Sequence, residues 1–170
     1  MNRLPRTALI VLGVVMAVPA VHAQDVEPKP MSNNWITDAP SDAERFERIQ
    51  KYLRGFDEAM HEVGERYEKI GEALAAENYD LALYHWDKIK VTIVNGYMKR
   101  PARKANADGF LLDAIWENTK KAFATQNKEQ AWQGFETVRS ACMGCHEAEK
   151  VGFINNQPLF NDLRSPERDK

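Results

Sequence analysis

The chain of 170 residues carries 23 basic and 25 acidic side chains, which gives it a formal charge of −2. This balance excludes the strongly basic surface with which proteins bind nucleic acids. The length suits one domain of ordinary size. Only two cysteines are present, so a site built from more than two thiols is excluded as well.

The N-terminus has the pattern of a secretory signal peptide. Arg3 and Arg6 precede an apolar run from Ala8 to Ala20 that is too short to span a bilayer, and the small residues Val21 and Ala23 follow it. We expect cleavage after Ala23, which removes residues 1–23; a membrane anchor that stays uncut is the alternative. The rest of the chain has no other apolar run long enough for a membrane span, and we expect export to a bacterial periplasm.

The next stretch, residues 24–40, contains prolines and no periodicity, which predicts an extended N-terminal arm. Ser41 and Glu44 form a capping box directly after it, so a helix is expected to begin there. The apolar residues that follow recur every three or four positions, which is typical of a bundle helix, here ending near Ala75 with a bend at Gly55. They are Phe46, Ile49, Leu53, Phe56, Met60, Val63, Tyr67, Ile70 and Leu74.

Three further helices are expected. The second runs from about Tyr79 until Pro101 stops it. The third covers about residues 108–125, and the fourth begins near Lys128. Four amphipathic helices joined by short connections predict an all-α fold, namely an antiparallel up-down-up-down four-helix bundle over residues 41–152, with a C-terminal tail after it.

The segment Cys142-Met143-Gly144-Cys145-His146 has the form Cys-x-x-Cys-His, the attachment signature of c-type haem. Each thiol can add across a haem vinyl group to form a thioether, and the adjacent imidazole can ligate the iron. Cys142, Cys145 and His146 fall within roughly 100° of a helix surface, so all three can face one macrocycle. The two cysteines continue the apolar stripe of the fourth helix, Ala131, Phe135, Val138, Cys142 and Cys145. We therefore expect one covalently bound haem c against the bundle interior.

The motif has three other interpretations. A zinc site would need further ligands, and only His61, His85 and His146 remain once the signal peptide is removed. A thioredoxin-like redox pair should open a helix inside a βαβ unit, which the helical pattern does not predict. The third interpretation is two packing cysteines beside a surface histidine. Export favours haem, because covalent haem attachment takes place outside the bacterial cytoplasm.

An exported chain with four helices and Cys-x-x-Cys-His late in the last of them resembles the cytochrome c′ superfamily. It looks most like low-spin, poorly characterised periplasmic relatives that share residues 55–67, 100–103 and 141–150. The resemblance covers most of residues 42–166, and since relatives often pair through their first two helices, a homodimer is compatible with it. Cytochrome c′ itself ends soon after its haem histidine, whereas this chain continues through a tail over residues 153–170.

The sixth iron ligand decides between electron transfer and gas binding. The first helix ends near Ala75, at the end of the bundle where the fourth begins near Lys128, so Met60 is expected level with about residue 143 and on the apolar stripe. Core packing alone would be the ordinary role of such a methionine. Low-spin relatives use a first-helix methionine as the distal ligand, and this resemblance makes Met60 our candidate.

Other side chains compete less well for the iron. Met98 is expected level with about residue 147, but it lies off the apolar stripe of its own helix. His61 and His85 are expected to be exposed or hydrogen-bonded histidines.

Arg100 and Arg103 are expected at the haem end of the bundle. Both are candidate partners of the haem propionates, because a guanidinium binds a carboxylate in a bidentate manner. A solvated basic loop is an equally good interpretation. Together with Lys99 and Lys104 they could also form a docking patch for an acidic redox partner.

These expectations combine into a periplasmic monohaem cytochrome c that carries single electrons between redox partner proteins. The alternative is a five-coordinate haem protein that binds or senses nitric oxide or carbon monoxide. A haem enzyme such as a peroxidase would need a distal base over the iron, and no residue has a claim to that role. We therefore expect no enzymatic activity.

Overall fold

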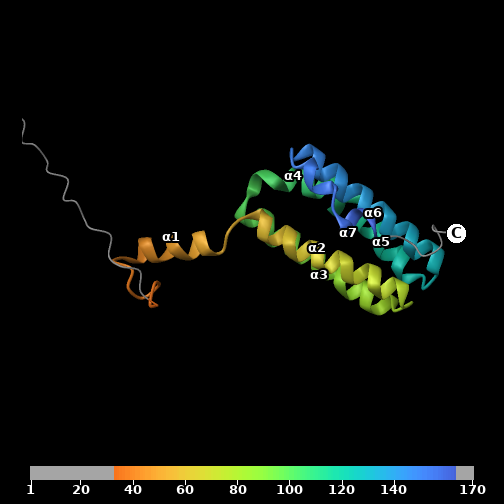
Figure 1. The fold of residues 1–170 in the computed structure, drawn as a ribbon, viewed down its shortest axis with the longest axis horizontal. Helices are drawn as coiled ribbons and strands as arrows, with labels where there is room; N and C mark the ends of the chain where they lie inside the picture. Colours follow the sequence, from red (N-terminus) through yellow and green to blue (C-terminus); the bar gives the residue numbers. More distant parts are fainter. Residues whose placement is uncertain (1–32, 164–170) are drawn as a thin grey trace, which may run out of the picture. The chain divides into compact units, whose positions relative to one another are not determined.

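A computed structural model describes residues 33–163 of the chain, and Figure 1 shows their path. The predicted signal peptide, the first part of the predicted arm and the end of the predicted tail lie outside the described residues. The chain divides into two units, residues 1–38 and 39–170. In the first unit, residues 33–38 form turns, with the Asp38 amide donating to the Asn34 carbonyl at 2.8 Å.

The described part of the second unit is helical and contains no strand, which confirms the predicted all-α class (Figure 1). Its elements are α1 (Asp42–Tyr52), α2 (Phe56–Ala75), α3 (Tyr79–Lys99), a 3₁₀ turn η1 (Pro101–Arg103), α4 (Lys104–Ala107), a π-helical turn η2 (Asp108–Leu112), α5 (Ala114–Ala124), α6 (Lys128–Ala148), a 3₁₀ turn η3 (Gly152–Asn155) and α7 (Pro158–Asn161). Among residues 33–163, no helix is both long and apolar enough to cross a membrane.

The start of α1 and the break after it follow local sequence signals. The Ser41 hydroxyl accepts a hydrogen bond from the Glu44 amide at 3.2 Å, as an N-cap should. The helix stops at Leu53, and α2 begins after Gly55, where the predicted bend becomes a complete break. The predicted apolar stripe is wrong for α1, because this helix has no buried residue and Phe46 is 67% exposed.

The core forms where four long helices pack in pairs. In the described chain, α2 contacts α3 and α6, while α5 contacts α6 and α3 (Figure 1). Two pairs of stacked aromatic rings lie at these helix contacts. Trp86 of α3 stacks on Trp116 of α5 with ring centroids 4.1 Å apart, and Tyr67 of α2 stacks on Phe135 of α6 at 4.3 Å. Burial of such large rings is the main stabilising contribution of this core.

The predicted third helix is interrupted. Instead of one helix over residues 108–125, the chain makes the π-helical turn η2, breaks at Asp113 and starts α5 at Ala114. The wider turn lets both Leu111 and Leu112 enter the core, while Phe110 packs against Gly144 of α6. The ring lies so near that an added Cβ on Gly144 would sit 3.0 Å from it.

The C-terminal tail folds back on the helices. Phe160 of α7 is only 4% exposed, and its carbonyl accepts a hydrogen bond from Arg139 Nη1 of α6 at 2.8 Å. Leu159 and Leu163 pack against Gly64 and Gly71 of α2. The tail therefore covers parts of α2 and α6.

Candidate functional site

The motif occupies the last turns of α6, and all five of its residues are half-buried. Both cysteines carry free thiols. Burial raises the pKa of the Cys142 thiol to about 12, and negative charge on Cys145 would add to this. Burial also raises the pKa of Cys145, although the positive charge of Arg103 opposes the effect. Redox-active cysteine pairs have lowered pKa values, so the raised pKa values of these two thiols disfavour the thioredoxin-like interpretation.

His146 is held by two residues of the tail. Its Nδ1 lies 2.7 Å from Oδ1 of Asn155, and its ring meets the ring of Phe160 edge-on at a centroid distance of 5.6 Å. These contacts fix both the position and the tilt of the imidazole.

The partners of Asn155 determine which atom faces His146. Asn155 Nδ2 donates to the Met143 carbonyl at 3.2 Å and to Glu147 Oε1 at 3.1 Å, and both of these atoms can only accept. The amide oxygen must therefore point at the imidazole, because the reverse orientation would set oxygen against oxygen. An oxygen 2.7 Å from Nδ1 requires a proton on that nitrogen, so the neutral imidazole has its lone pair on Nε2.

The motif supplies the residue types that covalent attachment of a haem needs. Attachment needs two thiols and a histidine nitrogen free to bind iron, with the other ring nitrogen hydrogen-bonded. Cys142, Cys145 and His146 meet these requirements. Within residues 33–163, the motif included, no group of three or more histidine, cysteine, aspartate or glutamate residues gathers where it could hold a metal ion.

The structure separates the two candidate arginines. Arg103 forms an ion pair with Glu149, just after α6, and Asn106 Nδ2 donates to the same carboxylate at 2.7 Å. The Glu149 side chain is only 11% exposed, so this cluster anchors η1 and α4 beside the motif. Arg100 instead lies against Gly55 at the start of α2, and its Nη1 donates to the Lys99 carbonyl at 2.9 Å.

The predicted docking patch is partly neutralised by its neighbours. Lys104 pairs with Asp108 and Arg103 with Glu149, while Lys99 Nζ donates to the Leu53 carbonyl at 3.1 Å.

The candidate distal residues differ in burial. Met60 of α2 is half-buried and packs against the core. Met98 of α3 is 71% exposed. His61 is exposed and pairs with Glu65 at 3.6 Å, whereas His85 is half-buried, and burial lowers its pKa.

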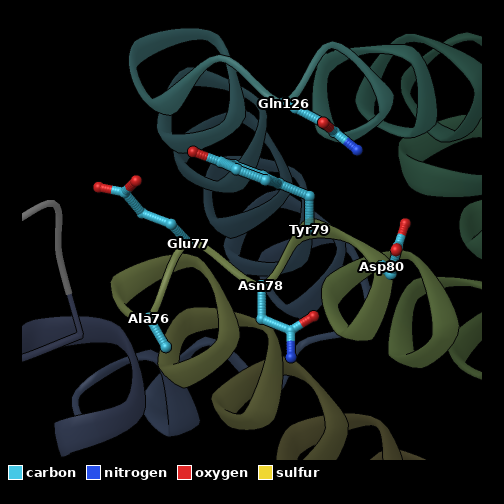
Figure 2. A pocket seen from close by; sticks show the side chains of 6 residues that line it. All are labelled: Ala76, Glu77, Asn78, Tyr79, Asp80 and Gln126. Carbon is cyan, nitrogen blue, oxygen red and sulfur yellow. The ribbon is translucent and has the colours of Figure 1, made fainter.

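Two surface hollows lie away from the motif. One, of about 550 Å³, lies between α2 and α3 and includes His61 and Met98 in its wall. The other, of about 370 Å³, lies where the α2–α3 turn meets the α5–α6 turn. Figure 2 shows the Tyr79 side chain of that hollow extending between the two turns, with Gln126 beyond it. Neither hollow is lined by a residue of the motif.

Four residues around the motif were missed by the sequence reasoning. Asn155, Glu149 and Phe110 carry no local signal, because their roles depend on contacts between separate segments. Phe160 belongs to the apolar part of the tail, so its burial could have been expected.

Comparisons of this chain with protein-family models, with curated proteins and with solved structures found no match.

Proposed function

We propose that this chain is an exported monohaem c-type cytochrome that carries single electrons in the periplasm. Cys142 and Cys145 would hold the haem, and Nε2 of His146 would ligate the iron. The observation that carries the proposal is the 2.7 Å contact between His146 Nδ1 and Asn155 Oδ1, since it leaves the lone pair of the imidazole on Nε2, in the residue that follows Cys145. Haem iron, when bound, supplies a reversible one-electron change.

We also propose the finer architecture, an antiparallel up-down-up-down bundle of α2, α3, α5 and α6 like that of the cytochrome c′ superfamily. The pairwise contacts of these four helices support it, as do the two ring stacks between them. The helix α1 and the tail are additions to that bundle. A short connection between α2 and α3, and another between α5 and α6, require each pair to be antiparallel.

The register between α2 and α6 supports Met60 as the sixth ligand. Tyr67 of α2 stacks on Phe135 of α6, which sets the level of the two helices. In an antiparallel pair, two turns back along α2 from Tyr67 correspond to two turns forward along α6 from Phe135. Those steps lead to Met60 and to Cys142. A heptad step also keeps each residue on the same helix face, so Met60 shares the side of α2 that faces α6.

The test is a visible spectrum of the protein produced with a haem-attachment system in a bacterial periplasm. After denaturation, haem should remain bound to wild type and be lost from the Cys142→Ser, Cys145→Ser double variant. Reduced wild type should show sharp low-spin absorption bands that do not shift when carbon monoxide is added. Met60→Ala should become high-spin and bind carbon monoxide, while Met98→Ala serves as the matched control and should behave as wild type.

Two results would contradict parts of the proposal. Wild type without covalent haem would remove the cytochrome function altogether. A wild-type spectrum that is high-spin and shifts with carbon monoxide would keep the haem but favour the five-coordinate, gas-binding alternative.

A further inference from the structure

We propose that Asn155 is a positioning residue for the iron ligand, and that its hydrogen bond to His146 sets the reduction potential of the haem. This inference rests on the proposed function. It adds a role for the tail, because Asn155 lies at the end of η3, outside the helix that carries the motif.

The side chain of Asn155 is held tightly enough for this role. It is only 9% exposed, and each of its polar atoms has a partner: His146 at Oδ1, and Met143 and Glu147 at Nδ2. A buried amide with all its hydrogen bonds made has one favourable orientation. The amide therefore cannot turn without leaving buried polar groups unpaired.

The backbone around η3 is shaped for the same contact. The Glu147 carboxylate lies directly over Gly152, where an added Cβ would clash with Glu147 Oε1. Gly152 thus allows η3 to come close enough to α6 for Asn155 to reach both Glu147 and His146. Phe160, whose ring meets the imidazole edge-on, is held by the hydrogen bond that Arg139 donates to its carbonyl.

The strength of the acceptor at Nδ1 controls the electron donation of the imidazole. A stronger acceptor draws the Nδ1 proton away and makes Nε2 more basic, which stabilises ferric iron and lowers the potential. A lost acceptor has the opposite effect. The Asn155 amide is a neutral acceptor. A negatively charged acceptor in its place should lower the potential, and removal of the acceptor should raise it.

The experiment compares two substitutions of nearly the same size. Asn155→Asp, made together with Glu147→Gln so that an amide rather than a carboxylate faces the new aspartate oxygen, keeps an acceptor at His146 and adds negative charge, so the midpoint potential should fall below that of Glu147→Gln alone. Asn155→Leu removes the acceptor, so the potential should rise. We expect each shift to be equivalent to about a tenfold change in the ferric-to-ferrous ratio, or about 59 mV for one electron. Asn156→Leu is the matched control, because exposed Asn156 accepts from Asn161 and should leave the potential unchanged.

Each outcome decides the inference. Shifts of opposite sign support it, since a purely structural defect would not reverse sign with the charge of the side chain. Shifts of the same sign in both variants, or none in either, overturn it. Should Asn155→Leu fail to fold, Asn155→Asp with Glu147→Gln decides alone, and a potential equal to or above that of Glu147→Gln alone overturns the inference. Wild type that lacks covalent haem defeats the proposed function itself, which is a separate result from haem that is present but insensitive to Asn155.

Discussion

Burial sets the protonation of the thiols of the motif, whereas hydrogen bonding sets the orientation of its imidazole. The Cys142 side chain packs against the core and Cys145 is half-buried. Burial raises the pKa of both thiols, because a thiolate would lose its hydration there. His146 is oriented by a specific partner, Asn155, rather than by burial alone. The two effects together give uncharged thiols next to an imidazole with a defined tautomer.

The other half-buried histidine makes the fold sensitive to acid. The pKa of His85 is lowered first by burial and then by the charges of Arg66 and Lys69, while Glu72 opposes them. His85 therefore binds a proton more readily in the unfolded chain than in the folded one. The free energy of unfolding should decrease as the pH falls below about 6.5. We expect His85→Gln to weaken that decrease in urea unfolding. An imidazole titration by NMR that places the folded pKa of His85 at or above its ordinary value would contradict this.

At the scale of elements, the sequence predicts helix ends better than helix partners. The starts of α3 and α6 were predicted within a residue, because Asn78 and Asn127 cap them by accepting from Leu81 and Gln130 amides at 3.1 and 3.0 Å. The π-helical turn η2 was not predicted, since its width depends on packing across the core. Periodicity likewise shows that α1 is amphipathic but not whether any segment covers its apolar side.

The exposure of α1 leads to a stability prediction. Phe46→Ala should change the free energy of unfolding by less than about 0.5 kcal/mol, because the ring is already in solvent. Ile70→Ala on α2 should cost about 2–5 kcal/mol, because Ile70 is completely buried. Denaturant midpoints of both variants measure the difference. A large loss for Phe46→Ala would mean that α1 is covered in solution.

Four helix ends adopt the left-handed conformation without glycine. Among residues 33–163, those with positive φ are Arg54, Glu77, Gln126 and Lys150. Each directly follows a helix C-cap, the position where glycine is the usual choice.

Gln126→Gly should therefore stabilise the protein. Its φ of 54° costs a side chain about 1 kcal/mol, which glycine avoids. The matched control is Gln133→Gly in the middle of α6, where the same substitution should destabilise by about 1 kcal/mol. Thermal unfolding of the pair should show shifts of opposite sign, and a lower midpoint for Gln126→Gly would count against the strain.

At the scale of the whole molecule, the tail belongs to the same folded unit as the helices. The sequence shows a tail with a few apolar residues among polar ones, but only the structure shows it packed on α2 and α6. This distinction matters for the site, because Asn155 and Phe160, the two partners of His146, both come from the tail. Contacts between segments far apart in sequence leave no periodic signal that sequence reasoning could use.

Two phenylalanines of the tail test whether it unfolds with the rest of the chain. Phe160 is 4% exposed and meets both Tyr67 and His146, whereas Phe153 is 78% exposed. Phe160→Ala should cost about 3–5 kcal/mol, a large share of the 5–15 kcal/mol or so that holds a domain together. Phe153→Ala should stay within about 0.5 kcal/mol.

The readout is guanidinium unfolding followed by both circular dichroism and tryptophan fluorescence. If tail and helices form one cooperative unit, both probes move together to lower denaturant in Phe160→Ala. If the tail frays independently, the denaturant midpoint of helix unfolding should stay at its wild-type value, because unfolding of the tail would not disturb the stacked rings of the core. The hydrogen bond of Asn155 to His146 would then be lost in a frayed minority of molecules rather than only on global unfolding, so this measurement also tells how permanently the imidazole is held.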